Sequence, residues 1–251
     1  KTNLNINIWG DNVSKLNKKI IFGIISLAII IVSVIEIKTA SEEVIKIMPI
    51  TNKTIIIDAG HGGIDPGAMT DDQSIKEKDV NLKIAKKVKE LIEASGAVVI
   101  LTRNDDTSLY TEEEGKTIRQ KYNENLRNRK KIIEESSADM FVSIHLNKFE
   151  QSKYYGAQTF YPAGKEDDKK LATYIQGELK RVVDNTNNRQ IKPRDDIYLI
   201  KDNDIPSTLI ECGFLSNDKE AKLLNDEEYQ DQIAWAIYVG IQKYFSEGKI
   251  K

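Results

Sequence analysis

The chain has 251 residues, of which 40% are hydrophobic and 30% charged, an ordinary globular composition. Its formal net charge of −2 argues against general nucleic-acid binding, which requires a basic face. The single cysteine, Cys212, excludes an intrachain disulfide and a cysteine metal cluster, so the ligands of any metal must be His, Asp or Glu.

The first forty residues differ from the rest of the chain. Residues 1–19 are basic, and residues 20–37 are almost entirely apolar. This apolar run is longer than most signal-peptide cores and slightly shorter than the roughly 20 residues that span a membrane comfortably. It predicts a transmembrane anchor or a signal sequence, and Lys38 favours the anchor because a cleavage site would need a small residue there. A buried core helix is the alternative, but the run has no polar face.

The lysines that precede the apolar run predict that the N-terminal end lies in the cytoplasm and the remainder is exported. Residues 1–40 contain five lysines and two acidic residues, which leaves 32 basic and 37 acidic residues for residues 41–251. The exported part is therefore mildly acidic. We expect residues 38–53 to form a linker and residues 54–247 to form a single domain.

The second part of the chain alternates between β-branched runs and amphipathic stretches, which predict strands and helices respectively. Strands are expected at 53–59, 97–102, 138–145, 156–162, 195–200 and 206–212, and helices at 78–95, 111–137, 169–183 and 226–245. Alternation of this kind predicts one α/β domain with a mostly parallel sheet and helices on both faces.

Four chemically reactive side chains fall near strand ends or helix starts. His61 follows the first predicted strand, His145 ends the third, Glu211 ends the last, and Glu77 stands just before the first helix. Ligands of open α/β sheets bind beyond the carboxyl ends of the strands, so these residues are expected to converge. Taken singly, each has a simpler explanation: His61 in a glycine turn, His145 as an ordinary strand-end residue, and Glu77 as a solvated acid at a helix start.

Two histidines and one glutamate form a known ligand set for catalytic zinc, which keeps its fourth position for water. A carboxylate that is not a ligand can then move the proton, and Glu211 is the candidate. The sequence contains no HExxH motif, which excludes a zincin-type site. In the competing interpretation, Glu211 is a fourth ligand and the site is structural.

Five motifs in order carry a resemblance to a known family. "IIIDAGHGGIDPGA", "EKDVNL", "LTRNDD", "ADMFVSIHLN" and "IECGFLSN" resemble the zinc-dependent N-acetylmuramoyl-L-alanine amidases of the amidase type 3 family, from about Lys53 to Phe245. The stretch "LRNRKKIIEESSAD" departs from the family pattern, because Ile133 and Glu134 replace an Ala-Asn pair. That position is helical and need not affect the chemistry.

The resemblance implies a mixed six-stranded sheet with flanking helices and a catalytic Zn²⁺ site. It assigns His61, Glu77 and His145 as the Zn²⁺ ligands and Glu211 as the catalytic glutamate. Asn147 is expected to lie beside the metal and contact the substrate. Residues 54–247 would then be the zinc amidase catalytic domain.

The implied reaction is hydrolysis of the amide between the lactyl group of N-acetylmuramic acid and L-alanine in peptidoglycan. The alternatives are a zinc peptidase that cuts within the stem peptide and a non-catalytic wall-associated scaffold. One apolar segment, one catalytic domain and no wall-binding repeats resemble the germination-specific amidases of spore-forming bacteria, which act on the spore cortex in a step towards muramic-δ-lactam. A vegetative autolysin without repeats would look much the same.

The expected binding partners follow from this interpretation. They are peptidoglycan glycan strands with stem peptides, an activating partner protein that helps a bare domain to engage glycan, and the membrane through the N-terminal segment; nucleic acid is not expected. The protein is expected on the outer side of the cytoplasmic membrane or secreted to the wall, and in a sporulating cell in the forespore cortex region.

Overall fold

The computed structural model describes residues 20–39 and 48–247. The chain divides into two units, Lys1–Ile47 and Met48–Lys251. In the first unit, Ile20–Thr39 form one helix with a mean hydropathy of 2.9, long and apolar enough to cross a membrane. It covers the predicted apolar segment, and its length and composition fit an anchor as well as a signal sequence. The predicted basic segment, 1–19, and residues 40–47 of the predicted linker lie outside the described residues.

Within residues 48–247, six strands form one mixed sheet in the order β2-β1-β3-β6-β4-β5, which confirms the predicted sheet. Neighbouring strands are parallel except for β4, which runs antiparallel to β6. The interior strand β1 is buried on both faces, and this explains its run of β-branched residues. The strands are β1 (Thr54–Ala59), β2 (Val98–Leu101), β3 (Met140–Asn147), β4 (Gln158–Tyr161), β5 (Lys192–Pro193) and β6 (Ser207–Phe214).

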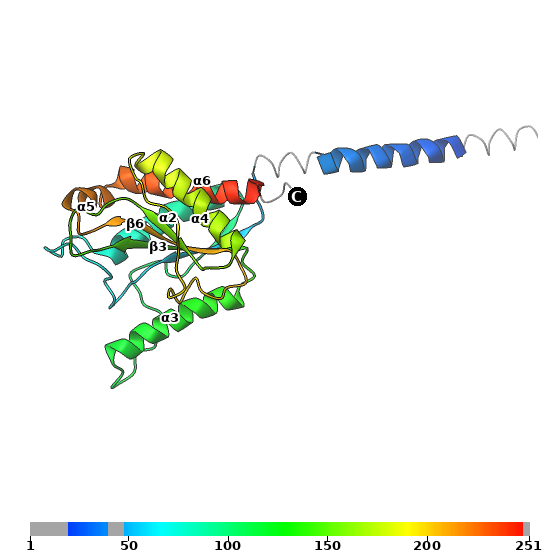
Figure 1. The fold of residues 1–251 in the computed structure, drawn as a ribbon. Helices are drawn as coiled ribbons and strands as arrows, with labels where there is room; N and C mark the ends of the chain where they lie inside the picture. The colour runs from blue at the N-terminus through cyan, green and yellow to red at the C-terminus, as the bar shows by residue number, and fades with distance from the viewer. Residues whose placement is uncertain (1–19, 40–47, 248–251) are drawn as a thin grey trace, which may run out of the picture. The chain divides into compact units, whose positions relative to one another are not determined.

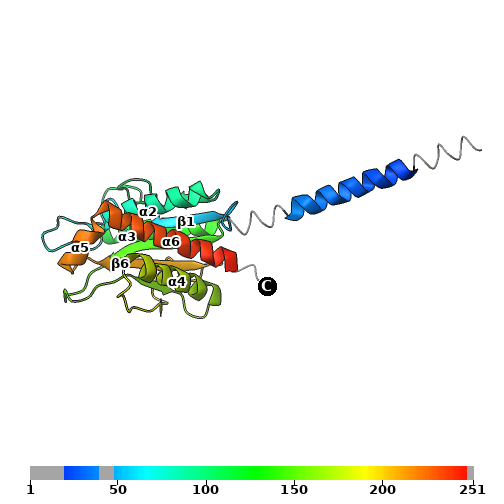
Figure 2. The same cartoon turned by 90° about the horizontal axis from the view of Figure 1, so that it is seen from above.

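Helices cover both faces of the sheet, as predicted. α2, α4 and α6 lie side by side on one face, with α6 between the other two, and α3 lies on the opposite face (Figures 1 and 2). Alternate residues of β1 serve the two cores: Ile55 and Ile57 face the larger core under α2, α4 and α6, whereas Ile56 packs with Ile133 of α3. The helices are α2 (Glu77–Ala94), α3 (Ile118–Glu135), α4 (Glu166–Glu178), α5 (Asp218–Leu224) and α6 (Glu227–Glu247).

Two helix predictions need correction at their ends. The helix expected at 111–137 begins only at Ile118, because Thr117 and Gln120 form a capping box and Gly115 has a positive φ of 79°. The helix expected at 169–183 begins at Glu166, and its last five residues, Leu179–Val183, form a π-helical turn. The short helix α5 was not predicted.

The strand expected at 195–200 is wrong, because this segment forms turns. Aspartate favours turns because its side chain accepts hydrogen bonds that compete with strand pairing. Asp195 accepts one from the backbone N–H of Ala163, and Asp196 accepts two from the Arg194 guanidinium. The apolar residues at the end of the segment are buried against the smaller core without pairing as a strand. The sheet is completed instead by the two residues of β5.

The strand order explains how the predicted site residues come together. β1, β3 and β6 are neighbours, and in the register Ala59 pairs with Ile144 and His145 pairs with Glu211. Their carboxyl ends therefore meet at one edge of the sheet, and α2 begins at the same edge with Glu77.

Candidate metal centre

The three predicted ligands converge on one point. The Oε1 atom of Glu77 lies 3.1 Å from Nε2 of His61 and 3.0 Å from Nδ1 of His145. One ligand atom from each residue lies within 4.8 Å of the other two. Ligand atoms around a tetrahedral zinc with bonds of roughly 2.0–2.2 Å are about 3.3 Å apart, so this donor set fits one zinc ion.

Glu77 is fixed in place by hydrogen bonds at both carboxylate oxygens. Oε2 accepts one from the backbone N–H of Ala68 (2.7 Å), and Oε1 accepts one from the backbone N–H of Leu146 (3.0 Å). Burial alone would raise the pKa of Glu77, but the hydrogen bonds and charges of His145 and His61 lower it well below its usual range. The structure therefore holds an ionised carboxylate between the two imidazoles.

His61 is oriented by a second carboxylate. Its Nδ1 lies 2.8 Å from Oδ2 of Asp65, four residues along the same turn. Burial would lower the pKa of His61, but hydrogen bonds to Asp65 and Glu77 outweigh it and raise the pKa to about 10. Such a site attracts a cation, and a neutral His61 that donates to Asp65 through Nδ1 presents its Nε2 to a metal. Asp65 was not predicted, although it stands in the "GHGGIDPG" motif.

Two glycines are required by close approaches inside this site. A Cβ on Gly60 would lie 2.3 Å from the His145 ring, and a Cβ on Gly67 would lie 2.5 Å from Oε2 of Glu77. His61 itself has a φ of 63°, which is uncommon for a residue other than glycine. The "GHGG" turn therefore brings backbone against the ligands and holds His61 in a costly conformation that the surroundings must support.

A buried ion pair supports the turn from below. Arg129 of α3 donates from Nη1 to Oδ1 of Asp58 at 2.5 Å, and both side chains are fully buried. Asp58 also accepts from the hydroxyls of Thr102 (2.7 Å) and Ser143 (2.6 Å). Burial would raise the pKa of Asp58, but the charge of Arg129 and these hydrogen bonds lower it to about 2. Asp58 therefore remains ionised and ties α3 to β1.

Two arginines hold the backbone that leads into His61. Arg129 donates to the carbonyl oxygens of Ala59 and His61, and Arg103 donates to those of Ala59 (2.9 Å) and Gly60 (3.1 Å). Three successive carbonyl groups therefore have charged donors. Sequence analysis gave neither arginine a role, although each lies in a stretch that it singled out, "LTRNDD" and "LRNRKK".

Glu211 stands on β6, directly opposite His145 of β3, and outside the group of three metal-ligand candidates. Its Oε2 atom is buried and has no hydrogen-bond partner among the described residues. Burial raises the pKa of Glu211 to about 7, although the nearby His145 acts in the opposite direction. A carboxyl group that titrates near neutrality and has a free oxygen is suited to accept and return a proton.

Asn147 lies at the end of β3, two residues beyond His145. Its backbone carbonyl accepts a hydrogen bond from Leu215 (2.8 Å), and the β3–β6 register shifts between His145 and Asn147. The structure therefore places Asn147 on the same strand as His145, and its contact with substrate stays a prediction.

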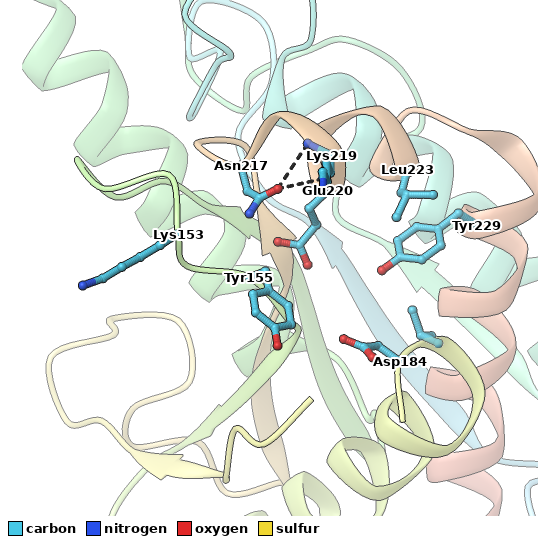
Figure 3. Close-up of a pocket in the computed structure, with 9 residues that line it drawn as sticks. Lys153, Tyr155, Asp184, Asn217, Lys219, Glu220, Leu223 and Tyr229 are labelled. Atoms are coloured by element: carbon cyan, nitrogen blue, oxygen red, sulfur yellow. Dashed lines mark hydrogen bonds between the residues drawn. The ribbon is translucent and has the colours of Figure 1, made fainter. Parts of the chain in front are cut away.

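A separate cavity of about 550 Å³ lies beside α5 and the start of α6, and none of the predicted site residues lines it (Figure 3). Glu220 reaches into it from α5, and its carboxylate accepts hydrogen bonds from the backbone N–H groups of Gly156 and Phe214, both at 2.8 Å. Asn217 caps the same short helix by accepting from Lys219 and Glu220 (Figure 3). Glu220 therefore ties the loop before β4 to the end of β6.

Known proteins are similar to the second unit of the chain, Met48–Lys251. Residues 55–243 match the family model Amidase_3, described as N-acetylmuramoyl-L-alanine amidase. The chain is 44% identical over 200 residues to the germination-specific N-acetylmuramoyl-L-alanine amidase of Bacillus subtilis (strain 168), covering 80% of this chain and 83% of that protein.

Solved structures are similar over the same region. The CwlD amidase from Clostridioides difficile, solved in complex with the GerS lipoprotein, is 73% identical with a TM-score of 0.78 and covers 78% of this chain and 100% of that one. The catalytic domain of CwlV from Bacillus (Paenibacillus) polymyxa var. colistinus is 32% identical with a TM-score of 0.63, covering 76% of this chain and 97% of that one.

Proposed function

The chain belongs to the N-acetylmuramoyl-L-alanine amidase family, and from this premise we propose that it is a zinc-dependent hydrolase with His61, Glu77 and His145 as metal ligands. Its reaction cleaves the amide between the lactyl group of N-acetylmuramic acid and L-alanine in peptidoglycan. The observation that carries the proposal is the convergence of the three ligand atoms, with the buried Glu211 carboxyl on the adjacent strand.

Each residue of the site has a distinct role in the proposed reaction. A zinc ion bound by the three ligands would polarise the scissile carbonyl and make a water molecule more acidic. Glu211 accepts the proton of the attacking water through its unpaired Oε2 and returns it to the departing amine of L-alanine. Asp65 holds His61 in the required tautomer, and Glu77 keeps its charge because its hydrogen-bond partners favour the ionised form. Asn147, at the end of β3, would contact the substrate.

The substitution Glu211→Gln tests this assignment, because it keeps the shape of the side chain and removes the base. We expect hydrolysis to fall by about 10²–10⁴-fold, while zinc content and melting temperature stay near those of the wild type. Mass spectrometry of the muropeptides measures the rate and identifies the bond that is cut. A product with a free amino terminus on L-alanine supports the amidase.

Other outcomes support the rival interpretations. Cleavage between residues of the stem peptide would indicate a peptidase, and no cleavage by the zinc-loaded wild type would favour a wall-associated scaffold. Loss of zinc together with a lower melting temperature in Glu211→Gln would mean that Glu211 is a fourth ligand of a structural site.

We also propose a role for this amidase in the spore cortex, where it would prepare the glycan for muramic-δ-lactam. The support is the 44% identity to a germination-specific amidase and the similarity to CwlD. Since that CwlD structure is a complex with a lipoprotein, we extend the expectation of a protein partner to this chain. Cortex muropeptides from spores that carry Glu211→Gln should lack the lactam, and an unchanged lactam content would contradict the cortex role.

The apolar helix suggests where the enzyme acts. We propose that Ile20–Thr39 anchor the catalytic unit to the outer side of the cytoplasmic membrane, or direct its secretion to the wall, at the forespore cortex in a sporulating cell. Reporter fusions after Lys53 should be active only when the reporter functions outside the cytoplasm. Activity confined to cytoplasmic reporters would contradict this topology.

A further inference from the structure

Two cavities lie next to each other along α3, and one of them contains the candidate metal ligands. A cavity of about 150 Å³ is lined by His61 and His145 and also by Leu126 and Leu199. Leu126 also lines a second cavity of about 270 Å³, so the two share a wall. The lining of this second cavity, which we call the α3 groove, is Asn123, Leu126, Arg127 and Tyr198.

The α3 groove has an apolar part and one cationic side chain. Leu126 and Tyr198 are 38% and 48% exposed, which is considerable for large apolar side chains beside an active site. Arg127 is exposed on α3, and no ion pair or hydrogen bond engages its guanidinium within residues 20–39 and 48–247. The neighbouring acid on the same helix, Glu124, forms its ion pair with Lys116. An exposed arginine is usually only solvated. Arg127 differs because it lines the α3 groove together with Leu126, which also lines the cavity that contains His61 and His145.

The substrate has two parts, the glycan and the stem peptide, one on each side of the scissile amide. Their charges indicate which part, or arm, would bind in a cationic groove. With the scissile amide at the metal centre, the glycan must leave in one direction and the stem peptide in another. The lactyl carboxyl is consumed in the amide, so the glycan arm carries no charge at this point. The peptide arm carries free carboxylates, and a guanidinium binds a carboxylate through two parallel hydrogen bonds.

We propose that the α3 groove is the subsite for the stem peptide, with Arg127 binding a peptide carboxylate and Leu126 and Tyr198 packing against its apolar surface. The inference rests on the proposed function, because it takes the scissile amide to lie at the metal centre. It goes beyond that function by naming the residues that distinguish the peptide arm from the glycan arm.

The test measures binding to the zinc-loaded Glu211→Gln protein, in which the ligand is not consumed. Two ligands are compared: a muramoyl tripeptide with free peptide carboxyls, and the same molecule with those carboxyls converted to carboxamides. Arg127→Ala should weaken the Kd of the acid about tenfold, as expected for one charge-assisted contact, and leave that of the carboxamide unchanged. Tyr198→Ala should weaken both ligands equally, because it removes packing and no charge.

A matched control comes from the same helix. Arg119 is also an exposed arginine of α3 and does not line the groove, so Arg119→Ala should leave both Kd values unchanged. Arg127→Lys should restore only part of the acid's affinity, because it keeps the charge and loses the planar fork. Equal melting temperatures and zinc contents would show that the surface variants are folded.

Three results would overturn the subsite. They are an unchanged Kd in Arg127→Ala, an equal loss for acid and carboxamide in that variant, and a loss in Arg119→Ala as large as that in Arg127→Ala. If Tyr198→Ala weakens a peptide-free disaccharide as much as the muramoyl tripeptide, the groove holds glycan and the proposal is wrong. The amidase assignment fails separately, if wild-type enzyme releases no free L-alanine amino terminus.

Discussion

The metal-binding edge of the sheet and the α3 groove lie next to each other and are built differently. At the edge, Glu77 and His61 are held by backbone N–H groups, a carboxylate and close glycine contacts, and Arg129 is buried beneath them. In the groove, Leu126 and Tyr198 are exposed. Metal ligands must be fixed before the metal binds, whereas a site for a variable peptide can adjust to it. The contrast predicts that substitutions at the edge affect metal and stability, and substitutions in the groove affect only substrate binding.

The largest effect should follow removal of either histidine ligand. His61→Ala and His145→Ala each leave two of three protein ligands, and the chain contains no third histidine that could replace them. We expect loss of stoichiometric zinc and of muropeptide hydrolysis, measured by metal analysis and mass spectrometry. Tyr198→Ala, in the groove, should keep its zinc. Full zinc occupancy in both histidine variants would contradict the metal centre.

A pair of arginines two residues apart on α3 tests the contrast directly. Arg129→Met leaves the buried Asp58 without its charged partner, which should destabilise the fold by about 3–5 kcal/mol. Arg127→Met, on the exposed side of the same helix, should change stability by less than about 0.5 kcal/mol. Urea unfolding of the two variants measures both values. Equal losses of unfolding free energy would mean that Arg127 supports the fold as much as Arg129 does, and the contrast between groove and edge would be wrong.

The contribution of the buried Asp58–Arg129 pair to stability should depend on pH. The pKa of Asp58 is about 2 in the folded protein, against 3.8 for an unperturbed aspartate. A lowered folded pKa stabilises the protein above the unfolded pKa, and this contribution is lost as pH falls from about 4 towards 2. The shift corresponds to roughly 2 kcal/mol. Asp58→Asn should therefore show a shallower loss of stability over that range than the wild type, and parallel curves would contradict the assignment.

Sequence patterns predicted the metal-binding edge, because its residues lie at the ends of strands. His61, His145 and Glu211 could be placed at one edge because parallel strands end together, and Glu77 joined them as the residue that begins α2. The roles of Arg103 and Arg129 could not be predicted, since nothing in the spacing shows that distant arginines donate to three successive carbonyl groups.

The α3 groove was harder still to predict. Residues 195–200 have the β-branched and aromatic composition of a strand, but Asp195 and Asp196 accept hydrogen bonds from Ala163 and Arg194, and the segment forms turns. Tyr198 and Leu199 reach the active-site side only because this segment turns. A surface formed by a helix and an irregular turn has no periodicity that a sequence can display.

A smaller effect at the edge should come from Asp65→Asn. Asparagine keeps the size of the side chain but loses the charge that orients His61 through Nδ1. Loss of such a hydrogen-bond partner typically lowers metal affinity by about 10–100-fold. Competition with a chelator measures the affinity, and the fold should keep its melting temperature in excess zinc. Unchanged affinity would mean that Asp65 is not needed to orient the ligand.

The smallest effect should come from the capping box of α3, the helix that carries three residues of the α3 groove. Thr117 accepts a hydrogen bond from the backbone N–H of Gln120 (3.3 Å), and the Gln120 side chain accepts one from the backbone N–H of Thr117 (2.8 Å). Thr117→Ala removes the first of these and should destabilise the helix by about 1 kcal/mol. Because the helix still packs on the sheet through Ile133 and is tied to β1 by Arg129, the loss should be confined to its first turn.

Hydrogen exchange should become faster in residues 118–122 and remain unchanged in β1 and β3, and zinc affinity should not change. Thr117→Ser, which keeps the hydroxyl, serves as the control. Weaker zinc binding in Thr117→Ala alone would mean that the start of α3 and the metal-binding edge are energetically coupled, and the separation between the two regions would then be wrong.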